Sequence, residues 1–526
     1  MQVRSNDHSH IAVCLLSSMI PIIIGAYTLS EPFGRDQGIH ATIAFSLQSG
    51  LTTYLDVFNI KPPMTTAMHW LALEIFGHSI FSIRYLDMLF VMLGMACLTS
   101  SILRLGYEKI IALGASVGFS SMYYSLTYWE HAQTDEWAII CIIICFFFLT
   151  VSWKYSVSYK RFIFIFLAGV FIGIGFSYKY TIAVTGILVF TPLLVKEDSI
   201  QFYWRDLFWF IVGGGVFLCF IIIILLATDS FVPFIEIQNF LRGYLNYNGS
   251  MLHLLSAPVT IALGHSIVNG TLVLFGAGMV VAGFFRQKTN TLHVTAIILT
   301  LCGGLSGYVQ GKGFIYHFIP ILFGYSLFFG YAVNEVLIII KKRFNINFNY
   351  LISSFVLVVI VILDTGTLRI NTFSLRDAFE KTPLETRFNR YDINADYSFP
   401  DTLKFSNMLS EIRQPDEDIF IWGYETGLYF LQETPPKYRY PYIWPFSVNF
   451  YDGRYTSDLL DRLKRSPPKY FVVQKNDATP WVTGHGLDSQ KILQNHLDVN
   501  NYLIENYEKI LQTDRFNLWE NNNKQQ

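Results

Sequence analysis

Residues 1–366 of this chain contain a succession of long apolar runs separated by polar connections. The chain is 52% hydrophobic and only 15% charged, whereas about a quarter of the residues of a typical soluble domain are charged. An apolar run of about 20 residues is long enough for a helix to cross the hydrocarbon core of a bilayer. The runs therefore predict a polytopic α-helical membrane protein.

About eleven transmembrane helices are expected if each span takes roughly 17–25 residues. The first run contains Pro21 and lacks a small-residue cleavage site, so we expect a retained helix and not a removed signal peptide. A broken or re-entrant element is expected around residues 177–180. The predicted spans are 11–29, 80–103, 109–127, 137–153, 161–177, 180–195, 207–227, 258–285, 291–309, 314–340 and 349–366.

Basic residues are concentrated in every second connection between these spans. The richest connection contains Lys341, Lys342 and Arg343, and the intervening connections have no such cluster. Short loops rich in Lys and Arg stay in the cytoplasm, so this bias predicts that the N-terminus lies inside. An odd number of spans then places the C-terminal region outside.

The first outside connection, residues 30–79, is too long to be a simple turn. Its second half starts with Lys61, Pro62 and Pro63, and proline is favoured at the first position of a helix. The apolar residues that follow predict a helix lying in the plane of the membrane interface. Residues 38–51 carry a weaker signal of the same kind.

Residues 367–526 change character and predict a small extracytoplasmic α/β domain beside a membrane domain of residues 1–366. Short apolar runs at 418–423, 469–474 and 515–519 are typical of buried strands. Helical stretches are expected at 425–432, 457–464 and 489–507. This alternation favours a partly parallel sheet, without fixing the strand order.

The composition excludes several classes of protein. All six cysteines lie in the apolar region, which argues against a disulfide framework and against a Cys-based zinc site in the tail. Cys141 and Cys145 share a helix face within a run of Ile and Phe, where packing is the better interpretation. No basic tract indicates a nucleic-acid partner.

Acidic residues occur where two of the predicted spans meet the outside. Asp36 follows the first span almost immediately, and Asp135 and Glu136 begin the fourth. An acid at such a position can be a solvated helix end, and Asp135 and Glu136 also suit the N-terminal cap of a helix. Because the acids fall on one side of the membrane, we interpret Asp36, Asp135 and Glu136 as candidate catalytic residues.

Basic residues and a histidine fall on the same side. Lys61 precedes two prolines, which hold its backbone extended and its ammonium group in place for a phosphate; the alternative is a lysine that snorkels to the interface. Lys312 lies between two glycines, which allow close backbone approach, and His317 follows five residues later. A structural role remains the alternative for His317, and Lys179 is a weaker candidate.

This order of signals resembles the GT-C-fold glycosyltransferases, and within them the bacterial proteins similar to protein O-mannosyltransferases and lipid A aminoarabinose transferases. The resemblance covers most of the chain through short motifs. One position departs from it, because Ile60 stands where the aminoarabinose transferases have Glu before Lys-Pro-Pro; Asp56 is then the nearest substitute. The matching features are Asp36, the Lys61-Pro62-Pro63 segment, Asp135, the segment with Lys312, Tyr316, His317 and Pro320, and an outside α/β tail.

The resemblance implies transfer of a sugar from a polyprenyl-phosphate donor to a lipid, glycan or protein acceptor. It implies a multi-pass protein of a bacterial inner or plasma membrane, with its active site on the periplasmic or extracellular side. Lys61, Lys312 and His317 would bind the donor phosphate, and Asp36 would act as general base in a single inverting displacement. Asp135 and Glu136 would orient the acceptor or hold a divalent cation such as Mg²⁺ or Mn²⁺.

Two other classes remain open at this point. A transporter or flippase for a lipid-linked glycan would also need spans and intramembrane charges. It would not require a one-sided set of acids or a large outside domain, and transporters often have internal repeats, of which we detect none. An accessory scaffold would leave the charges without a use.

Overall fold

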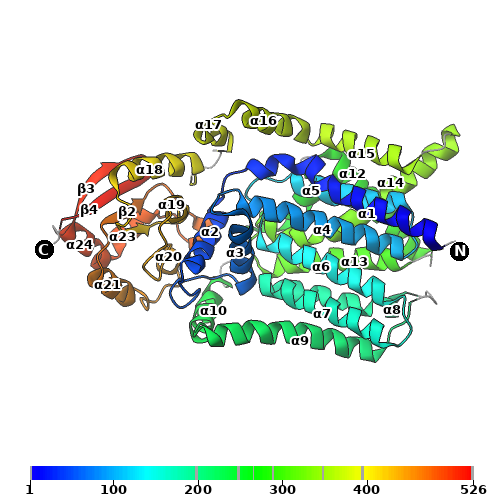
Figure 1. Cartoon of the computed structure of the whole chain (residues 1–526), viewed down its shortest axis with the longest axis horizontal. Coiled ribbons are helices and arrows are strands. Elements are labelled where there is room, and N and C mark those ends of the chain that lie inside the picture. The colour runs from blue at the N-terminus through cyan, green and yellow to red at the C-terminus, as the bar shows by residue number, and fades with distance from the viewer. Residues whose placement is uncertain are drawn as a thin grey trace.

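The protein is described from a computed structural model, which places an elongated helical bundle beside a smaller part that contains a sheet (Figure 1). The N-terminus lies at the far end of the bundle and the C-terminus at the opposite end of the molecule. The structure describes residues 3–195, 200–245, 249–264, 266–286, 290–345, 349–391 and 396–522.

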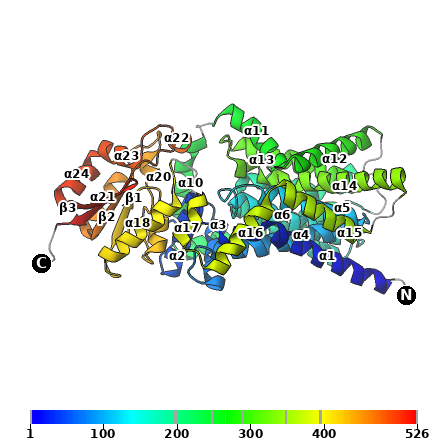
Figure 2. The same cartoon turned by 90° about the horizontal axis from the view of Figure 1, so that it is seen from above.

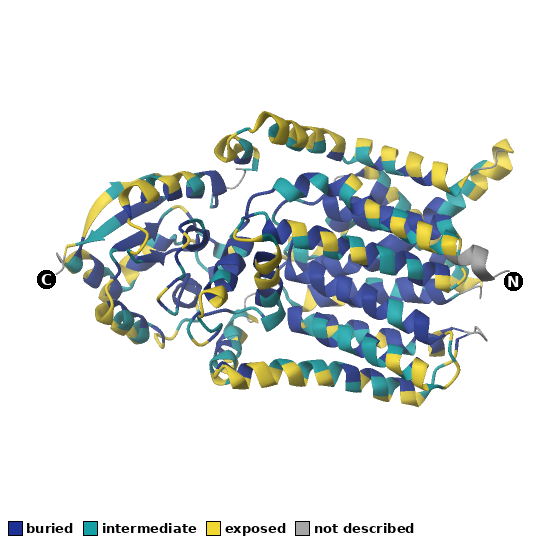
Figure 3. Ribbon diagram, in the orientation of Figure 1, coloured by how far each residue is buried: buried dark blue, intermediate teal, exposed yellow. Residues whose placement is uncertain are grey.

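The bundle consists of long apolar helices that run side by side. Helix α6 is buried almost all round, so it forms the centre, whereas α9 exposes most of its apolar surface, as a lipid-facing helix does (Figure 3). The helices are α1 (Val3–Gly25), α4 (Ser82–Arg104), α5 (Lys109–Tyr124), α6 (Thr134–Ser152), α7 (Tyr159–Tyr178), α9 (Trp204–Ala227), α12 (Ile267–Phe285), α13 (Thr291–Val309), α14 (Leu322–Phe344) and α15 (Tyr350–Asp364).

The predicted membrane architecture is confirmed, but the count of about eleven spans is not. Within the described residues, eight helices are long and apolar enough to cross a membrane, or up to nine if α15 and α16 (Thr367–Glu380), which meet at 80°, form one span. The remaining predicted spans are short or broken. Helix α5 has 16 residues, and residues 180–195 form the 3-10 helix η2 (Tyr180–Phe190) and the one-turn α8 (Thr191–Leu194). Gly264, in the left-handed region at φ 47°, separates α11 (Met251–Leu263) from α12.

The end of the bundle that faces the sheet is built from shorter helices. They are the 3-10 helix η1 (Ala26–Ser30), α2 (Arg35–Gln48), α3 (Pro63–Phe76), α10 (Phe231–Leu245), α11 and the 3-10 helix η3 (Ile315–Ile321). Helix α3 begins at the second proline of the Lys-Pro-Pro segment, as predicted. Seen from above, α10 and α11 lie where the bundle meets α20 (Trp444–Ser447) and α22 (Pro480–Thr483) of the C-terminal part (Figure 2).

The C-terminal part contains a four-stranded sheet of order β1-β2-β4-β3. Strands β1 (Ile419–Trp422) and β2 (Tyr470–Gln474) are parallel, whereas β4 (Phe516–Asn521) is antiparallel to β2 and to β3 (Tyr507–Gln512). The predicted partly parallel sheet is confirmed, and β3 is an addition. The helices are α17 (Leu384–Phe388), the 3-10 helix η4 (Asn389–Tyr391), α18 (Phe399–Ile412), α19 (Gly427–Leu431), α20 (Trp444–Ser447), α21 (Thr456–Arg465), α22 (Pro480–Thr483), α23 (Ser489–Asn495) and α24 (Leu497–Asn506).

One apolar cluster joins the two parts of the molecule. Ile39 and Ile43 of α2 pack in the same buried cluster as Phe58, Trp422 and Tyr442, and the Thr42 hydroxyl donates a hydrogen bond to the backbone carbonyl of Thr426 at 2.8 Å. The cluster holds α2 against the C-terminal part, and α2 approaches α19 closely where Gly38 meets Gly427. The division into domains of residues 1–366 and 367–526 stays a prediction.

Glycines allow α7 and α9 to approach closely. A Cβ atom on Gly169 would lie 2.0 Å from the carbonyl oxygen of Phe210, and one on Gly213 would lie 2.1 Å from that of Phe166. Close backbone approach at small residues is a main source of helix association in membranes, where lipid competes with every apolar side chain.

The substitution Gly213→Val should therefore lower the stability of the helix pair by about 1–3 kcal/mol through overpacking. Gly215→Val, on the same helix, is the matched control, because a Cβ atom there meets nothing within 4 Å. The thermal unfolding midpoints of the two purified variants in detergent measure the difference. Equal midpoints would show that the close approach of α7 and α9 at Gly213 does not contribute to stability.

Candidate active site

A cavity of about 680 Å³ lies where the bundle meets the C-terminal part. Its walls come from α2, from α10 and α11, from segments around residues 60–62, 129–133, 179–181 and 310–317, and from C-terminal loops. Four of the predicted site residues line it, namely Asp36, Lys61, Lys312 and His317. The fold thus brings together residues that are far apart in the sequence.

Asp36 and Lys61 face each other across this cavity. Asp36 lies in the first turn of α2, where the helix dipole favours a carboxylate. The Lys61 ammonium lies 3.8 Å from the Asp36 carboxylate, and the two side chains keep 18% and 31% of their surface exposed. The backbone of Lys61 is fixed on both sides, since its N–H donates to Asn59 at 3.0 Å and its carbonyl accepts from the Tyr54 hydroxyl at 2.8 Å.

Asp135 reaches the cavity through a lysine. Lys179 lines the cavity and donates to the buried Asp135 carboxylate at 3.1 Å. Burial lowers the pKa of Lys179, and the nearby Asp135 carboxylate opposes that effect. Lys179, the weaker candidate, therefore lines the cavity. Asp135 affects the cavity indirectly, because its carboxylate holds the Lys179 ammonium in position.

Glu136 does not line the cavity and turns into the bundle. Its carboxylate accepts a hydrogen bond from the Tyr123 hydroxyl at 2.9 Å, next to Asp87, which accepts from the Trp137 indole at 2.8 Å. Asp135 and Glu136 therefore point to different partners. Among the described residues, no group of three or more His, Cys, Asp or Glu side chains is arranged to hold a metal ion.

Lys312 lies in the turn before η3, and His317 lies within η3. Gly311 and Gly313 on either side of Lys312 adopt positive φ values of 66° and 72°, which explains the Gly-Lys-Gly pattern. The Lys312 ammonium donates to the carbonyl of Tyr244 at 2.6 Å, and burial lowers its pKa to about 8. His317 packs against Tyr316, whose ring centroid lies 5.9 Å from the Lys61 ammonium.

Ile60, the position that departs from the aminoarabinose transferases, lies beside Lys61 in the cavity wall. Ile60 lines the cavity, so an apolar side chain occupies the position where the resemblance implies a carboxylate. Asp56 does not line the cavity, and its carboxylate accepts from the backbone N–H of Thr52 at 2.8 Å. Asp56 therefore caps its own turn and does not replace the missing Glu.

Arg35 is a site residue that the sequence did not indicate. Its guanidinium group donates to the Asp396 carboxylate at 3.2 Å and lies 4.0 Å from Glu425. It also lies over the rings of Tyr397 and Tyr424, at 5.4 and 5.7 Å. Burial raises the pKa of Glu425 to about 7. No local pattern reveals this contact, because Arg35 and Asp396 are 361 residues apart.

His40 is a second residue that sequence reasoning missed. It lies one helical turn after Asp36 on the same face of α2, is buried, and lines the cavity. No described residue hydrogen-bonds to either of its ring nitrogens. Burial and the nearby Lys61 hold the pKa of His40 well below its ordinary value, so the imidazole is neutral and can both donate and accept.

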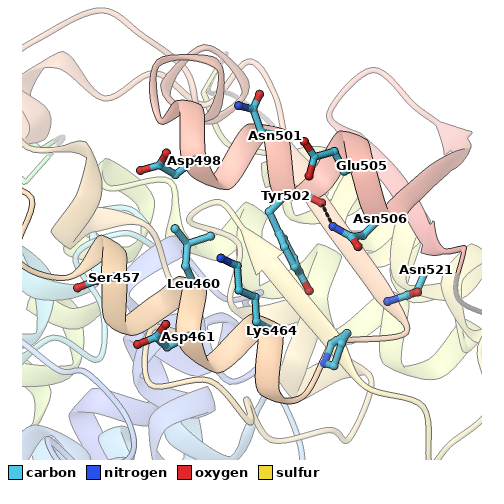
Figure 4. Close-up of a pocket in the computed structure, with 11 residues that line it drawn as sticks. Ser457, Leu460, Asp461, Lys464, Asp498, Asn501, Tyr502, Glu505, Asn506 and Asn521 are labelled. Atoms are coloured by element: carbon cyan, nitrogen blue, oxygen red, sulfur yellow. Dashed lines mark hydrogen bonds between the residues drawn. The ribbon is translucent and has the colours of Figure 1, made fainter.

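A second cavity, of about 630 Å³, lies between α21 and α24 (Figure 4). Polar side chains such as Lys464, Asp498 and Glu505 surround it, but none of the predicted site residues lines it. We assign it no chemistry.

Comparisons with known proteins agree with this architecture. Residues 60–226 match the family model described as dolichyl-phosphate-mannose-protein mannosyltransferase. ArnT from Cupriavidus metallidurans bound to undecaprenyl phosphate has a similar structure, with a TM-score of 0.57 at 13% identity over 98% of each chain. ArnT of the same organism in the apo state gives a TM-score of 0.58 at 12% identity over 99% of this chain and 98% of that one. No curated protein sequence matches the chain.

The predicted resemblance and fold class are thus confirmed by two kinds of comparison. The matched segment runs from Ile60 through Asp135 to the end of α9 and so includes Lys61 and Lys179. The structural match extends over the helical bundle and the C-terminal sheet together. The chain therefore has a fold similar to that of ArnT, and its residues 60–226 are similar to the dolichyl-phosphate-mannose-protein mannosyltransferases.

Proposed function

We propose that this protein transfers a sugar from a polyprenyl-phosphate donor to a hydroxyl of a lipid, glycan or protein acceptor. The observation that carries the proposal is the charge arrangement of the cavity. Among the described lining residues, three carboxylates occur, namely those of Asp36, Glu130 and Asp396. Glu130 accepts from Thr127 at 2.5 Å and Asp396 pairs with Arg35, so Asp36 is the carboxylate best placed to act on a substrate.

The donor phosphate would bind to the ammonium groups of Lys61 and Lys312, with the Lys179 ammonium as a third cation and a ring N–H of His317 as a hydrogen-bond donor. These residues meet at one cavity and could offset the charge that develops on the departing phosphate. Leu241, Leu245 and Ala257 of α10 and α11 supply an apolar wall beside them, which suits the lipid tail. The undecaprenyl phosphate bound in the similar ArnT structure supports this kind of donor.

Asp36 would serve as the general base. When the donor phosphate pairs with Lys61, the contact of Lys61 with Asp36 weakens and the carboxylate becomes free to accept a proton. The acceptor oxygen then bonds to the anomeric carbon, the bond from that carbon to the phosphate oxygen breaks, and the acceptor proton passes to Asp36. Polyprenyl phosphate leaves, and a single displacement of this kind inverts the anomeric centre.

The two acidic residues at the start of α6, Asp135 and Glu136, have different roles in the proposed reaction. Asp135 positions Lys179 from beneath the cavity wall, through their 3.1 Å contact. Glu136 has no part, because it faces Tyr123 in the bundle. No step requires Mg²⁺ or Mn²⁺ at this pair of residues.

His40 would bind a hydroxyl of the transferred sugar. A buried imidazole without a partner costs free energy unless a ligand supplies one, and a neutral imidazole suits a hydroxyl better than an anion. Because His40 lies one helical turn from Asp36, it would lie beside the reacting carbon of a bound donor. The positive-inside pattern supports an extracytoplasmic location for this site, and the resemblance supports a bacterial inner or plasma membrane.

Asp36→Asn should lower the rate of sugar transfer by roughly 10²–10⁴-fold, because it removes the base while keeping the size of the side chain. The measurement is release of polyprenyl phosphate by the purified protein from a panel of polyprenyl-phosphate sugars. Asp416→Asn, at an exposed position outside the cavity, is the matched control. Full transfer by Asp36→Asn would rule out the assigned base.

The same assay separates the enzyme from the transporter alternative. A flippase would move a lipid-linked sugar across a liposome membrane without forming a glycosidic product. Movement without product, in both the native protein and the Asp36→Asn variant, would favour transport.

Lys312 should give the reaction a pH dependence. A lysine is charged below its pKa, so the value of about 8 predicts that kcat/KM for the donor falls as the pH rises through that value. Arginine stays protonated throughout this range, so Lys312→Arg should move the fall to higher pH. An unchanged pH profile in Lys312→Arg would show that Lys312 does not bind the phosphate.

A further inference from the structure

The cavity has two chemically different walls. The bundle contributes its lysines and the Asp36 carboxylate. The C-terminal part contributes mainly uncharged side chains, and its one charged lining residue in the described chain, Asp396, is engaged by Arg35. The lining residues of this second wall, here named the aromatic wall, are Tyr424, Tyr442, Trp444, Thr479, Trp481 and Val482.

The aromatic wall is built where the parallel strands end. Tyr424 follows β1, and the segment with Thr479 and Trp481 follows β2. Because β1 and β2 are parallel, their carboxyl ends lie at the same edge of the sheet, which is where open α/β sheets bind ligands. The fold thus presents the loops of the sheet, and not its faces, to the cavity.

The aromatic wall is also tied to the candidate phosphate site. The Tyr442 hydroxyl is hydrogen-bonded to the backbone of Ile60, the residue before Lys61. Trp444 packs edge-on against Tyr244 with ring centroids 5.8 Å apart, and Tyr244 accepts from Lys312. A group resting on this wall would therefore lie beside the donor phosphate.

Trp481 differs from the other aromatic residues of the wall. Tyr424, Tyr442 and Trp444 are buried, whereas Trp481 is 43% exposed. It belongs to the one-turn helix α22, and no ring stacking of Trp481 occurs among the described residues. A large indole held open at the rim of a cavity is well suited to contact a bound ligand.

From this wall we infer that the acceptor is an uncharged sugar ring, so that the chain extends a glycan or a glycolipid. The inference rests on the proposed function. A pyranose has an apolar C–H face that packs on an indole and hydroxyls that reach polar groups such as that of Thr479. A phosphorylated acceptor would need cations here, and no described Lys, Arg or His of residues 396–522 lines the cavity. Extended peptides are commonly bound by a free sheet edge, whereas this wall offers side-chain rings.

The test uses the full chain, purified and supplied with a polyprenyl-phosphate sugar that it cleaves. Neutral oligosaccharides, a Ser- and Thr-containing peptide and a phosphorylated oligosaccharide are compared as acceptors. Neutral oligosaccharides should be used, and Trp481→Ala should raise their KM roughly three- to tenfold, the loss expected for one aromatic contact. Trp481→Phe should stay within about twofold of the native protein because a ring is kept.

The KM for the donor should be unchanged in both variants, which separates acceptor binding from a general loss of structure. Leu497→Ala, at an exposed position of α24 outside the cavity, is the matched control. Use of only the peptide or the phosphorylated acceptor would overturn the inference. An acceptor KM for Trp481→Ala equal to that of the control would overturn it as well.

Release of polyprenyl phosphate with water as acceptor distinguishes a failure of the inference about the acceptor from a failure of the proposed function. If donor cleavage occurs but no neutral sugar accepts, the inference about the acceptor fails and the proposed function stands. If no donor is cleaved with any acceptor, the proposed function fails with it.

Discussion

The contact of Arg35 with Asp396 and Glu425 holds the site together. Arg35 opens α2, so its guanidinium group fixes the start of the helix that presents Asp36 and, one turn later, His40. Its partners belong to the C-terminal part, and the rings of Tyr397 and Tyr424 flank it. A buried ion pair of this kind contributes little net stability, because desolvation offsets the attraction, but it favours one arrangement over others. The cavity therefore depends on both parts of the chain being present together.

In the proposed function, two lysine–carboxylate pairs prepare the cavity for an anion. Lys61 faces Asp36 at 3.8 Å and Lys179 contacts Asp135 at 3.1 Å. The first pair is long and partly exposed, so a phosphate can compete for Lys61. The second is shorter and its carboxylate is fully buried, so Lys179 keeps its position when a ligand arrives. One cation can thus exchange its partner while the other stays fixed.

The fold was predictable where a local sequence pattern determines the structure of an element. Apolar runs gave the membrane helices, two short buried runs gave the parallel strands, and prolines marked the start of α3. The sequence indicated a broken element around residues 177–180, where α7 ends and η2 begins. The 3-10 form of η2 and the break at Gly264 were not predictable, because these segments have the same apolar composition as regular spans. Asp135 and Glu136 illustrate the limit for the site. Adjacent helical residues point about 100° apart, so one contacts the cavity lysine and the other faces the bundle, and sequence alone does not say which.

Long-range packing explains what else the sequence could not reveal. Tyr442 belongs to a loop and Trp481 to the one-turn helix α22, in a polar segment that composition alone would assign to a solvated tail. Both line the cavity between the bundle and the C-terminal part because α2 docks on α19. Ile60, which stands where the resemblance implies a carboxylate, lines the same cavity. With an apolar side chain before Lys61, the proposed phosphate site has one negative charge fewer than the resemblance implies. The Ile60 backbone is hydrogen-bonded to Tyr442. Asp36 is then left as the carboxylate of the described lining that has a lysine as its ion-pair partner, which strengthens its assignment as the base.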